Sequence, residues 1–434
     1  MKHFIFAVVL ATLISTTMWG QQSTAPAADT AALEQKFRDM EDRIIALEGQ
    51  VRALKATAAQ AQPAPVTSPE TATEPSPLVS GTAPAETSAT SSSSAFARPI
   101  NLGGASNAGK ALNPDISVIG DFIGVAGHNS ISPSPALEMH ESEIGLQAII
   151  DPYARGDFFL SFGEKGVNVE EAFITFTALP AGFTARVGKM RSAFGKVNMM
   201  HNHVLPFVDR PLVSNSLTGG EDGIDDAGFS LEHILPAPKG IFLDVTAQLF
   251  RGDSGGGNQL VFQSHRKSDV STVEHLRAYK DLTESTNLDI GLSYARGHNE
   301  LGSAFLTQLY GVDATVHWKP LRRAIYHSFV GRGEFIWSQR QQLPVEQRAF
   351  GFYTSGEYQL GRRWFVGGRY DLSDRSRFAN QTDKGGSAIL TYWPSEFSQI
   401  RTQYRYTKYA ENIGAHEVLF QVLFSLGAHG AHPF

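Results

Sequence analysis

Over the last three-quarters of the chain, apolar and polar residues alternate in segments of about ten residues, which turn residues separate. In NLDIGLSYAR, apolar side chains recur at every second position from Leu288 to Tyr294, with Asp289, Gly291 and Ser293 between them. A period of two residues indicates β-strands with one apolar and one polar face. The polar face carries small hydrophilic residues, as expected where a strand lines water rather than a packed core.

Sixteen such segments follow one another, an even number, as closed bacterial barrels have. Roughly every second connection is tight, as in DPYA and LPAG, and most others are longer, which is typical of outer-membrane barrels. We therefore predict an all-β fold, a transmembrane antiparallel β-barrel of about 16 strands within residues 114–434. The predicted strands are 116–127, 138–151, 153–163, 168–178, 182–191, 226–234, 240–251, 271–283, 286–297, 306–319, 323–338, 347–360, 362–373, 385–393, 399–409 and 415–427.

A soluble β-sandwich or propeller is the alternative to the barrel. No repeat of the length of a propeller blade is visible, and a sandwich would have shorter strands without a one-sided bias of long loops. Trp318, Trp364 and Trp393 lie beside tight turns, where a membrane barrel carries an aromatic girdle. The pattern therefore favours the membrane barrel.

Residues 1–113 are organised differently. Residues 1–22 place a lysine before an apolar run and then small polar residues, the plan of a secretory signal peptide. Residues 30–56 have a helical pattern, and residues 57–113, rich in Ala, Pro, Ser and Thr, are predicted to be a disordered linker. No later segment approaches eighteen continuous apolar residues. We therefore expect an exported chain that crosses a membrane only through its barrel.

The helix 30–56 carries an apolar seam at alternating spacings of four and three residues, which predicts a coiled coil. The alternative is a single amphipathic helix packed on its own domain. β-branched residues at the first seam position and Leu at the second favour dimers, whereas RIIALE resembles a short trimer-specifying motif, so the helix alone leaves both open. The residues expected in oligomerisation are Leu33, Phe37, Met40, Arg43, Ile44, Leu47, Glu48, Val51 and Leu54.

Composition narrows the range of partners. The net charge of −6 is spread thinly, so nothing supports a nucleic-acid partner. The absence of cysteine excludes a disulfide framework, thiol catalysis and a lipoprotein acylation site. Only 18% of residues are charged, while Gly (41) and Phe (28) are plentiful, as in a protein with half its surface in lipid or in a Gly-rich soluble β-protein.

The longest connection, about residues 192–226, follows the fifth predicted strand and carries five acids against two bases. By strand parity, arginines of later strands fall on the face opposite the lipid-facing residues. Acids on this loop and arginines on the wall would set a field across a constriction, or would simply pair structurally. The candidate constriction residues are Asp209, Arg210, Glu221, Asp222, Asp225 and Asp226, and the candidate pore-wall residues are Arg332, Glu334, Arg369, Arg401 and Arg405.

The segments ESEIGLQAIID, VEEAFITFT and VGKMRSAFGKVN, together with the long loop, resemble porins of the phosphate-selective superfamily. The leading coiled coil resembles the N-terminal periplasmic helix of some trimeric outer-membrane porins. The resemblance implies a trimer of sixteen-stranded barrels that pass small solutes, with the loop after the fifth strand folded into the channel. It does not extend to the repeated basic ladder of the true phosphate channels.

We therefore expect a porin for small anionic or polar solutes in the outer membrane of a Gram-negative-type bacterium, with a periplasmic N-terminal region. The expected partners are outer-membrane lipid, two further copies of the chain in a homotrimer, and the solutes in transit. The alternative is a tether that links the membrane to the cell wall through the coiled coil, although no wall-binding domain is recognisable.

Other chemistry has little support in the sequence. No nucleophile elbow or comparable motif joins the Ser, His and Asp residues, so we expect no enzyme. His201 and His203 in HNH, with His429 and His432, are the metal-binding candidates, but loop histidines without cysteine or a clustered carboxylate set are mostly bystanders. We therefore expect no catalytic residue, no cofactor and no metal ligand.

Overall fold

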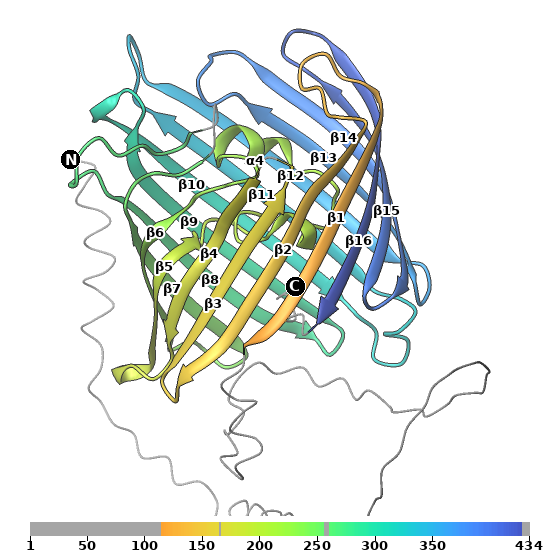
Figure 1. The fold of residues 1–434 in the computed structure, drawn as a ribbon, viewed down its shortest axis with the longest axis horizontal. Helices are drawn as coiled ribbons and strands as arrows, with labels where there is room; N and C mark the ends of the chain where they lie inside the picture. Colours follow the sequence, from red (N-terminus) through yellow and green to blue (C-terminus); the bar gives the residue numbers. More distant parts are fainter. Residues whose placement is uncertain (1–113, 165, 256–259, 428–434) are drawn as a thin grey trace, which may run out of the picture. The chain divides into compact units, whose positions relative to one another are not determined.

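A computed structural model describes residues 114–427, apart from 165 and 256–259. Sixteen strands form one closed barrel, in which each strand pairs antiparallel with its neighbours in sequence and β1 pairs with β16 (Figure 1). The prediction of an all-β, sixteen-stranded antiparallel barrel is confirmed. The expected signal peptide 1–22, helix 30–56 and linker 57–113 lie outside the described residues, as do His429 and His432.

Most strands begin and end within a few residues of the predicted positions. The strands are β1 Asp115–His128, β2 Leu137–Asp151, β3 Ala154–Gly163, β4 Gly166–Phe176, β5 Phe183–Arg191, β6 Asp225–Leu235, β7 Ile241–Phe250, β8 Ser271–Thr283, β9 Thr286–Asn299, β10 Gly302–Trp318, β11 Phe329–Arg340, β12 Gln347–Gln359, β13 Trp364–Asp374, β14 Thr382–Ser395, β15 Ser398–Lys408 and β16 Gly414–Gly427. The short helices are η1 Pro180–Gly182, η2 Asn202–Val204 and α4 Leu212–Leu217.

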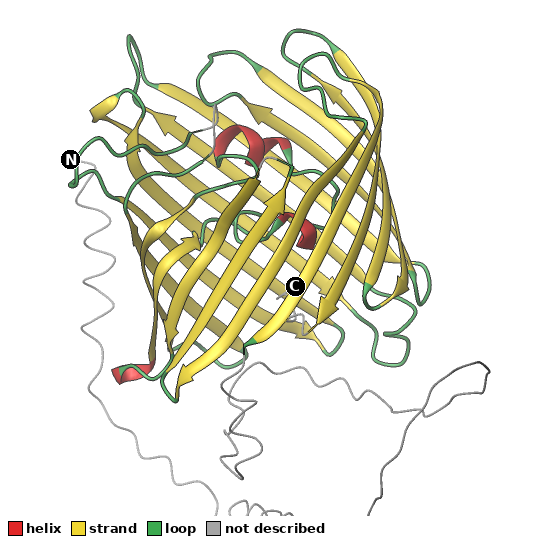
Figure 2. Cartoon of the chain, in the orientation of Figure 1, coloured by secondary structure: helices red, strands yellow, loops and turns green. Residues whose placement is uncertain are grey.

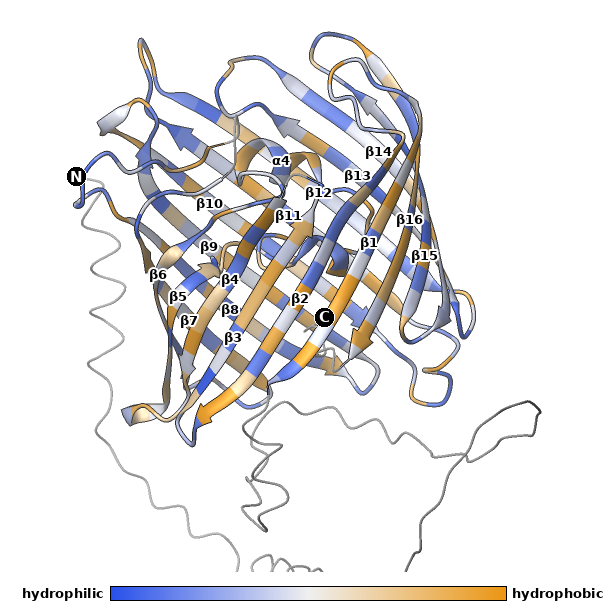
Figure 3. Ribbon diagram, in the orientation of Figure 1, coloured by the Kyte–Doolittle hydropathy of each residue, from blue (hydrophilic) through white to orange (hydrophobic). Residues whose placement is uncertain are grey.

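The barrel is polar inside and apolar outside, and Figure 3 shows the alternation along its strands. On β16, Val418, Phe420 and Phe424 are 41–43% exposed, whereas Glu417 and Gln421 on the opposite face are at most 2% exposed. Such an arrangement is the reverse of a soluble protein and suits an exterior of lipid. Closure of β1 on β16 leaves no unpaired strand edge, so the backbone hydrogen bonds are satisfied without water.

The two rims differ in their connections. One carries short turns such as 152–153, while the other carries the long connections 192–224 and 251–270. Connections on both rims depart from the predicted scheme. The predicted strands 306–319 and 323–338 leave a tight turn at 320–322, but the connection in the structure is longer, residues 319–328. Successive turns with hydrogen bonds back to residues 320 and 323 occupy it, so β11 begins later than predicted. The connection 300–301 is short although it lies at the long-loop rim.

The connection between β5 and β6, residues 192–224, folds into the barrel and is called the inner loop below. Figure 2 shows its two short helices, η2 and α4, surrounded by the strands of the wall. α4 packs against β11, β12, β13 and β14.

No helix among the described residues has the length and the apolar character needed to cross a membrane.

Candidate functional site

Hydrogen bonds from its backbone to polar side chains of the wall fix the path of the inner loop. Five of its N–H groups donate to side-chain oxygens on five different strands. A buried N–H without an acceptor is costly, so each of these wall side chains stabilises one point of the loop. The donor–acceptor pairs are Ala193–Gln248, Gly195–Ser293, Val197–Glu334, Val208–Gln403 and Leu212–Asp371.

Apolar side chains of the inner loop pack against the wall as well. Phe194, Phe207 and Val213 are at most 1% exposed, and the ring of Phe207 lies edge-on to the ring of Tyr353 on β12, with 5.7 Å between centroids. Gly351 on β12 admits Val213, because a Cβ at this glycine would lie 2.8 Å from the Val213 Cγ2. The inner loop therefore has a small apolar core of its own within a polar barrel.

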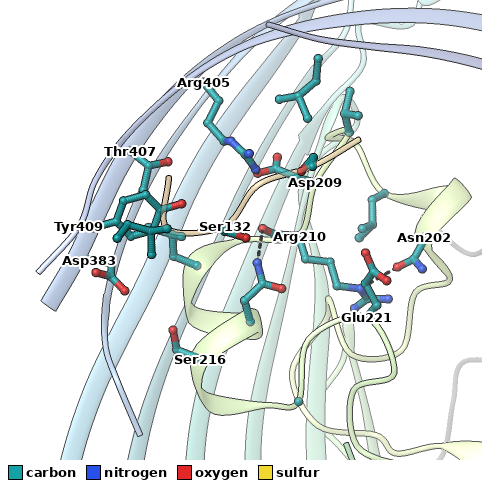
Figure 4. A pocket seen from close by; sticks show the side chains of 18 of the residues that line it. Ser132, Asn202, Asp209, Arg210, Ser216, Glu221, Asp383, Arg405, Thr407 and Tyr409 are labelled. Carbon is teal, nitrogen blue, oxygen red and sulfur yellow. Dashed lines mark hydrogen bonds and ion pairs between the residues drawn. The ribbon is translucent and has the colours of Figure 1, made fainter. Parts of the chain in front are cut away.

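Asp209 at the middle of the inner loop lies between two arginines of the wall. Its carboxylate is 3.0 Å from Nη2 of Arg369 on β13 and 2.7 Å from Nη1 of Arg405 on β15. Each arginine has a second acidic partner, Asp371 at 2.7 Å and Glu417 at 2.6 Å, respectively. Figure 4 shows Arg405 and Asp209 pointing toward one another. The predicted facing of loop acid and wall arginine is present here, in the form of direct ion pairs.

This environment changes the pKa of Asp209. Burial alone raises the pKa of the carboxyl group, but the guanidinium groups of Arg369 and Arg405 outweigh burial and lower the pKa to about 2. A carboxyl group whose pKa is lowered by folding stabilises the folded arrangement above its ordinary pKa of about 4 and loses this contribution as the pH falls toward 2.

We accordingly expect the inner loop to stay anchored from neutral pH down to about pH 4 and to loosen between about pH 4 and 2. Single-channel recordings across this range should show a rise in conductance or in current noise below pH 4. The variant Asp209→Asn lacks this titrating group and should lack this step. A step of equal size in both proteins would contradict the assignment to Asp209.

The other predicted wall arginines differ in their contacts. Arg401 donates through Nη1 to the backbone carbonyls of Leu205 and Phe207, at 2.7 and 3.1 Å, and so holds the inner loop by its backbone. Arg332 on β11 is half-buried, and its Nη1 has no hydrogen-bond partner among the described residues. Arg210 does not face the wall, because its guanidinium bonds to carbonyl and amide oxygens of the inner loop itself.

The acids at the end of the inner loop do not reach these arginines. Glu221 is exposed, and its carboxylate lies 3.2 Å from Nε2 of His140 on β2. Asp222 is exposed too, and its backbone carbonyl accepts a hydrogen bond from Arg191 on β5. In the described part of the chain, Asp209 is the one predicted loop acid that pairs with the predicted wall arginines, Arg369 and Arg405.

Asp225 and Asp226 were predicted in the constriction loop, but in the structure they are the first two residues of β6. Asp225 lies 2.9 Å from Nζ of Lys189 on β5. Asp226 accepts hydrogen bonds from the backbone N–H groups of Gly252 and Asp253 and thereby fixes the start of the connection 251–270. Their contacts are thus with the rim rather than with the pore wall.

Sequence reasoning missed a cluster of acids around His201 on the inner loop. Nδ1 of His201 lies 2.6 Å from Glu143 on β2 and 3.1 Å from Glu170 on β4, and Nε2 lies 2.9 Å from Glu171. Strict alternation would turn the last two glutamates to opposite faces. The pairing of β3 with β4 shifts register at this point, and the resulting β-bulge lets both carboxylates reach the imidazole. In the sequence, the two adjacent glutamates of VEEAF are the only sign of this acidic cluster.

A polar cavity of about 620 Å³ lies between the inner loop and the long-loop rim. Figure 4 shows part of its lining, with Thr407 and Tyr409 at the end of the wall on one side and Asp209 and Arg210 of the inner loop on the other. Its charged lining is mixed in sign, with Arg375 and Arg377 as well as acids. The arrangement provides a polar space beside the loop that folds into the barrel.

No model of a known protein family matches the chain. An uncharacterised protein of Aquifex aeolicus (strain VF5) is 28% identical over 385 residues, covering 75% of this chain and 81% of the relative. Similar solved structures include the outer membrane channel DcaP of Acinetobacter baumannii (12% identity, 72% of this chain and 96% of that chain, TM-score 0.49). OmpT, an outer membrane protein of Vibrio cholerae (9%, 72% and 97%, 0.48), and OmpF of Salmonella typhi (10%, 73% and 99%, 0.48) are also similar.

Proposed function

We propose that this chain is an outer-membrane porin, a water-containing channel through which small polar solutes diffuse passively. The observation that carries the proposal is the inside-out barrel with a long loop folded into its interior. An exterior of large apolar side chains suits lipid. Polar side chains in the interior cost little free energy of folding only where water or groups of opposite charge contact them. The role that we propose is passive transport and not catalysis.

The sequence analysis led us to expect anionic or polar solutes, and a preference for anions stays a prediction. Arg369 and Arg405 are each balanced by acids, so these two arginines add little net positive field. Arg332 supports the preference, because its half-buried guanidinium has an Nη1 without a hydrogen-bond partner among the described residues. Arg401 has no acidic partner in an ion pair within the described part of the chain either, but it holds the inner loop, so Arg332 is the residue at which the proposed selectivity can be tested without releasing the loop.

Orientation and assembly belong to the same proposal. Ser117 of β1 pairs with Gly427 of β16, so the start of the first strand and the end of the last strand both lie at the rim with the short turns. Short turns face the periplasm in outer-membrane barrels, which favours a periplasmic N-terminal region. We further propose a homotrimer, which chemical crosslinking or light scattering of the detergent-solubilised protein can test.

Planar-bilayer recording tests the proposed function. Addition of the purified full-length protein should produce discrete conductance steps, because each inserted channel opens a water path of fixed width. Steps that insert in groups of three would further support a trimer. A protein that inserts into vesicles as a folded barrel but seals the membrane to small ions would overturn the proposal.

A further inference from the structure

We propose that Glu143, His201 and His203 form a binding site for a divalent transition-metal ion of the zinc class, which joins the inner loop to the barrel wall. The ligand atoms of these three buried residues all lie within 4.8 Å of one another. A second trio, Glu141, Glu143 and Glu170, meets the same criterion and shares Glu143. The inference concerns metal binding by the folded chain and holds independently of channel activity.

The distances suit a tetrahedral ion with small adjustments. Oε2 of Glu143 lies 3.6 Å from Nδ1 of His203 and 2.6 Å from Nδ1 of His201. Zn–N and Zn–O bonds of about 2.0–2.1 Å place neighbouring ligands of a tetrahedron about 3.4 Å apart. The first distance is already of this size, and the second needs to lengthen by less than about 1 Å.

A carboxylate behind His201 orients its ring for this role. Oε2 of Glu171 lies 2.9 Å from Nε2 of His201, so Nε2–H donates to it. Nδ1, which lies 2.6 Å from Glu143, is the ring nitrogen left to bind an ion once its own proton is displaced. A carboxylate that accepts from the outer ring nitrogen of a metal-binding histidine is a common feature of zinc sites. The backbone N–H of Arg191 donates to the other oxygen of Glu171 at 2.7 Å and holds this carboxylate in place.

The cluster needs positive charge. With Nε2–H pointing at Glu171, Nδ1 of His201 and the carboxylate of Glu143 are two acceptors in contact, and two acceptors attract one another only through a cation or a proton between them. Glu141 is 6% exposed, and its Oε1 has no hydrogen-bond partner among the described residues. Arg191 pairs with Glu170 at 3.2 Å, and Asn202 donates to Oε2 of Glu141 at 3.2 Å, so Oε1 of Glu141 and the carboxylate of Glu143 remain for a metal ion.

Ligand type and access fit the same class of ion. Two imidazoles with carboxylates suit Zn²⁺ and its neighbours Co²⁺ and Ni²⁺ better than Ca²⁺ or Mg²⁺, which prefer oxygen ligands alone. A pocket of about 200 Å³, lined by Glu141, Glu170 and Asn202, borders the second trio, so a hydrated ion can approach the shared Glu143 from this side. Since His201 and His203 belong to the inner loop and the glutamates to β2 and β4, a bound ion would clamp the loop to the wall.

The test uses the full-length detergent-solubilised protein after treatment with a chelator. Titration with Zn²⁺ by calorimetry should show one site per chain, and Co²⁺ should give the intense visible absorption of a tetrahedral complex. His203→Gln and Glu143→Gln remove ligands and should weaken binding about 100-fold or more, and Glu171→Gln, which acts through His201, about 10–100-fold. His128→Gln, on an exposed histidine at the end of β1, is the matched control and should bind as the unmodified protein does.

A variant lacking His429 and His432 separates this site from the histidines near the chain end and should keep full binding. Circular dichroism and heat-modifiable migration on gels confirm that each variant is a folded barrel. Failure of the folded protein to bind Zn²⁺ or Co²⁺ would overturn the proposal, as would equal binding by the unmodified protein and folded His203→Gln. In either case a proton shared between His201 and Glu143 balances the charge instead. Conductance steps from a protein that binds no metal would leave the porin proposal intact.

Discussion

Replacing Asp209 with asparagine will release the inner loop from Arg369 and Arg405 and increase single-channel conductance and current noise. Asp209 carries the charge that both Arg369 and Arg405 face, and its side chain is only 15% exposed. Removal of one partner from a buried ion pair costs about 3–5 kcal/mol. Since Asp371 and Glu417 remain, we expect about 3 kcal/mol, or about a hundred-fold in the ratio of docked to undocked loop.

Asp222→Asn is the matched control, because it makes the same chemical change on an exposed side chain of the same loop. Its conductance should equal that of the unmodified channel. Limited proteolysis gives an independent reading, since a released inner loop becomes accessible to a protease while the barrel stays resistant. An inner loop that remains protected in Asp209→Asn, with unchanged conductance, would show that the apolar contacts and backbone hydrogen bonds alone hold the loop.

Arg332→Glu will shift the ion preference of the channel toward cations. The change replaces a positive by a negative charge on the inner face of β11 without removing an anchor of the inner loop. A unit charge within about 4 Å of an ion in water is worth about 1 kcal/mol, so we expect the cation-to-anion permeability ratio to rise at least about five-fold. Reversal potentials in a KCl gradient measure this ratio directly.

Arg332→Gln removes the charge with less disturbance and should give a shift of the same sign and about half the size in free energy. Arg348→Glu changes the charge equally, but its side chain is 77% exposed at the start of β12, so its reversal potential should stay near that of the unmodified channel. Identical reversal potentials for the three folded variants would remove Arg332 from the proposed selectivity. The reversal potential of the unmodified channel in the same gradient shows whether the channel prefers anions at all.

The strands of the barrel wall could be predicted from the sequence because their pattern depends only on neighbouring residues. Each residue of a strand faces either lipid or the lumen, so a period of two residues records the fold directly, as in Leu288 to Tyr294. The start of β11 at Phe329, six positions after the predicted start at 323, shows the limit. Residues 323–328 have a strand-like composition, but their turns satisfy the backbone within the rim.

The candidate site could be predicted only in part. Strand parity places Arg369, Arg401 and Arg405 on the inner face, where the structure has them. Their partners were not predictable, because the path of the inner loop is fixed by contacts such as Val208 with Gln403, far apart in sequence. The His201 cluster depends on a bulge, which interrupts the alternation on which the prediction rested.

The pairing of β1 with β16 has a consequence for biogenesis. The first strand of the barrel finds its second partner only when the last strand has been made and exported, so closure depends on the contact most distant along the chain. Until then, β1 and the latest strand present open edges that can recruit strands of other chains. A chain truncated before Gly414 keeps both edges open, and such a product should aggregate or be degraded rather than accumulate as a smaller channel.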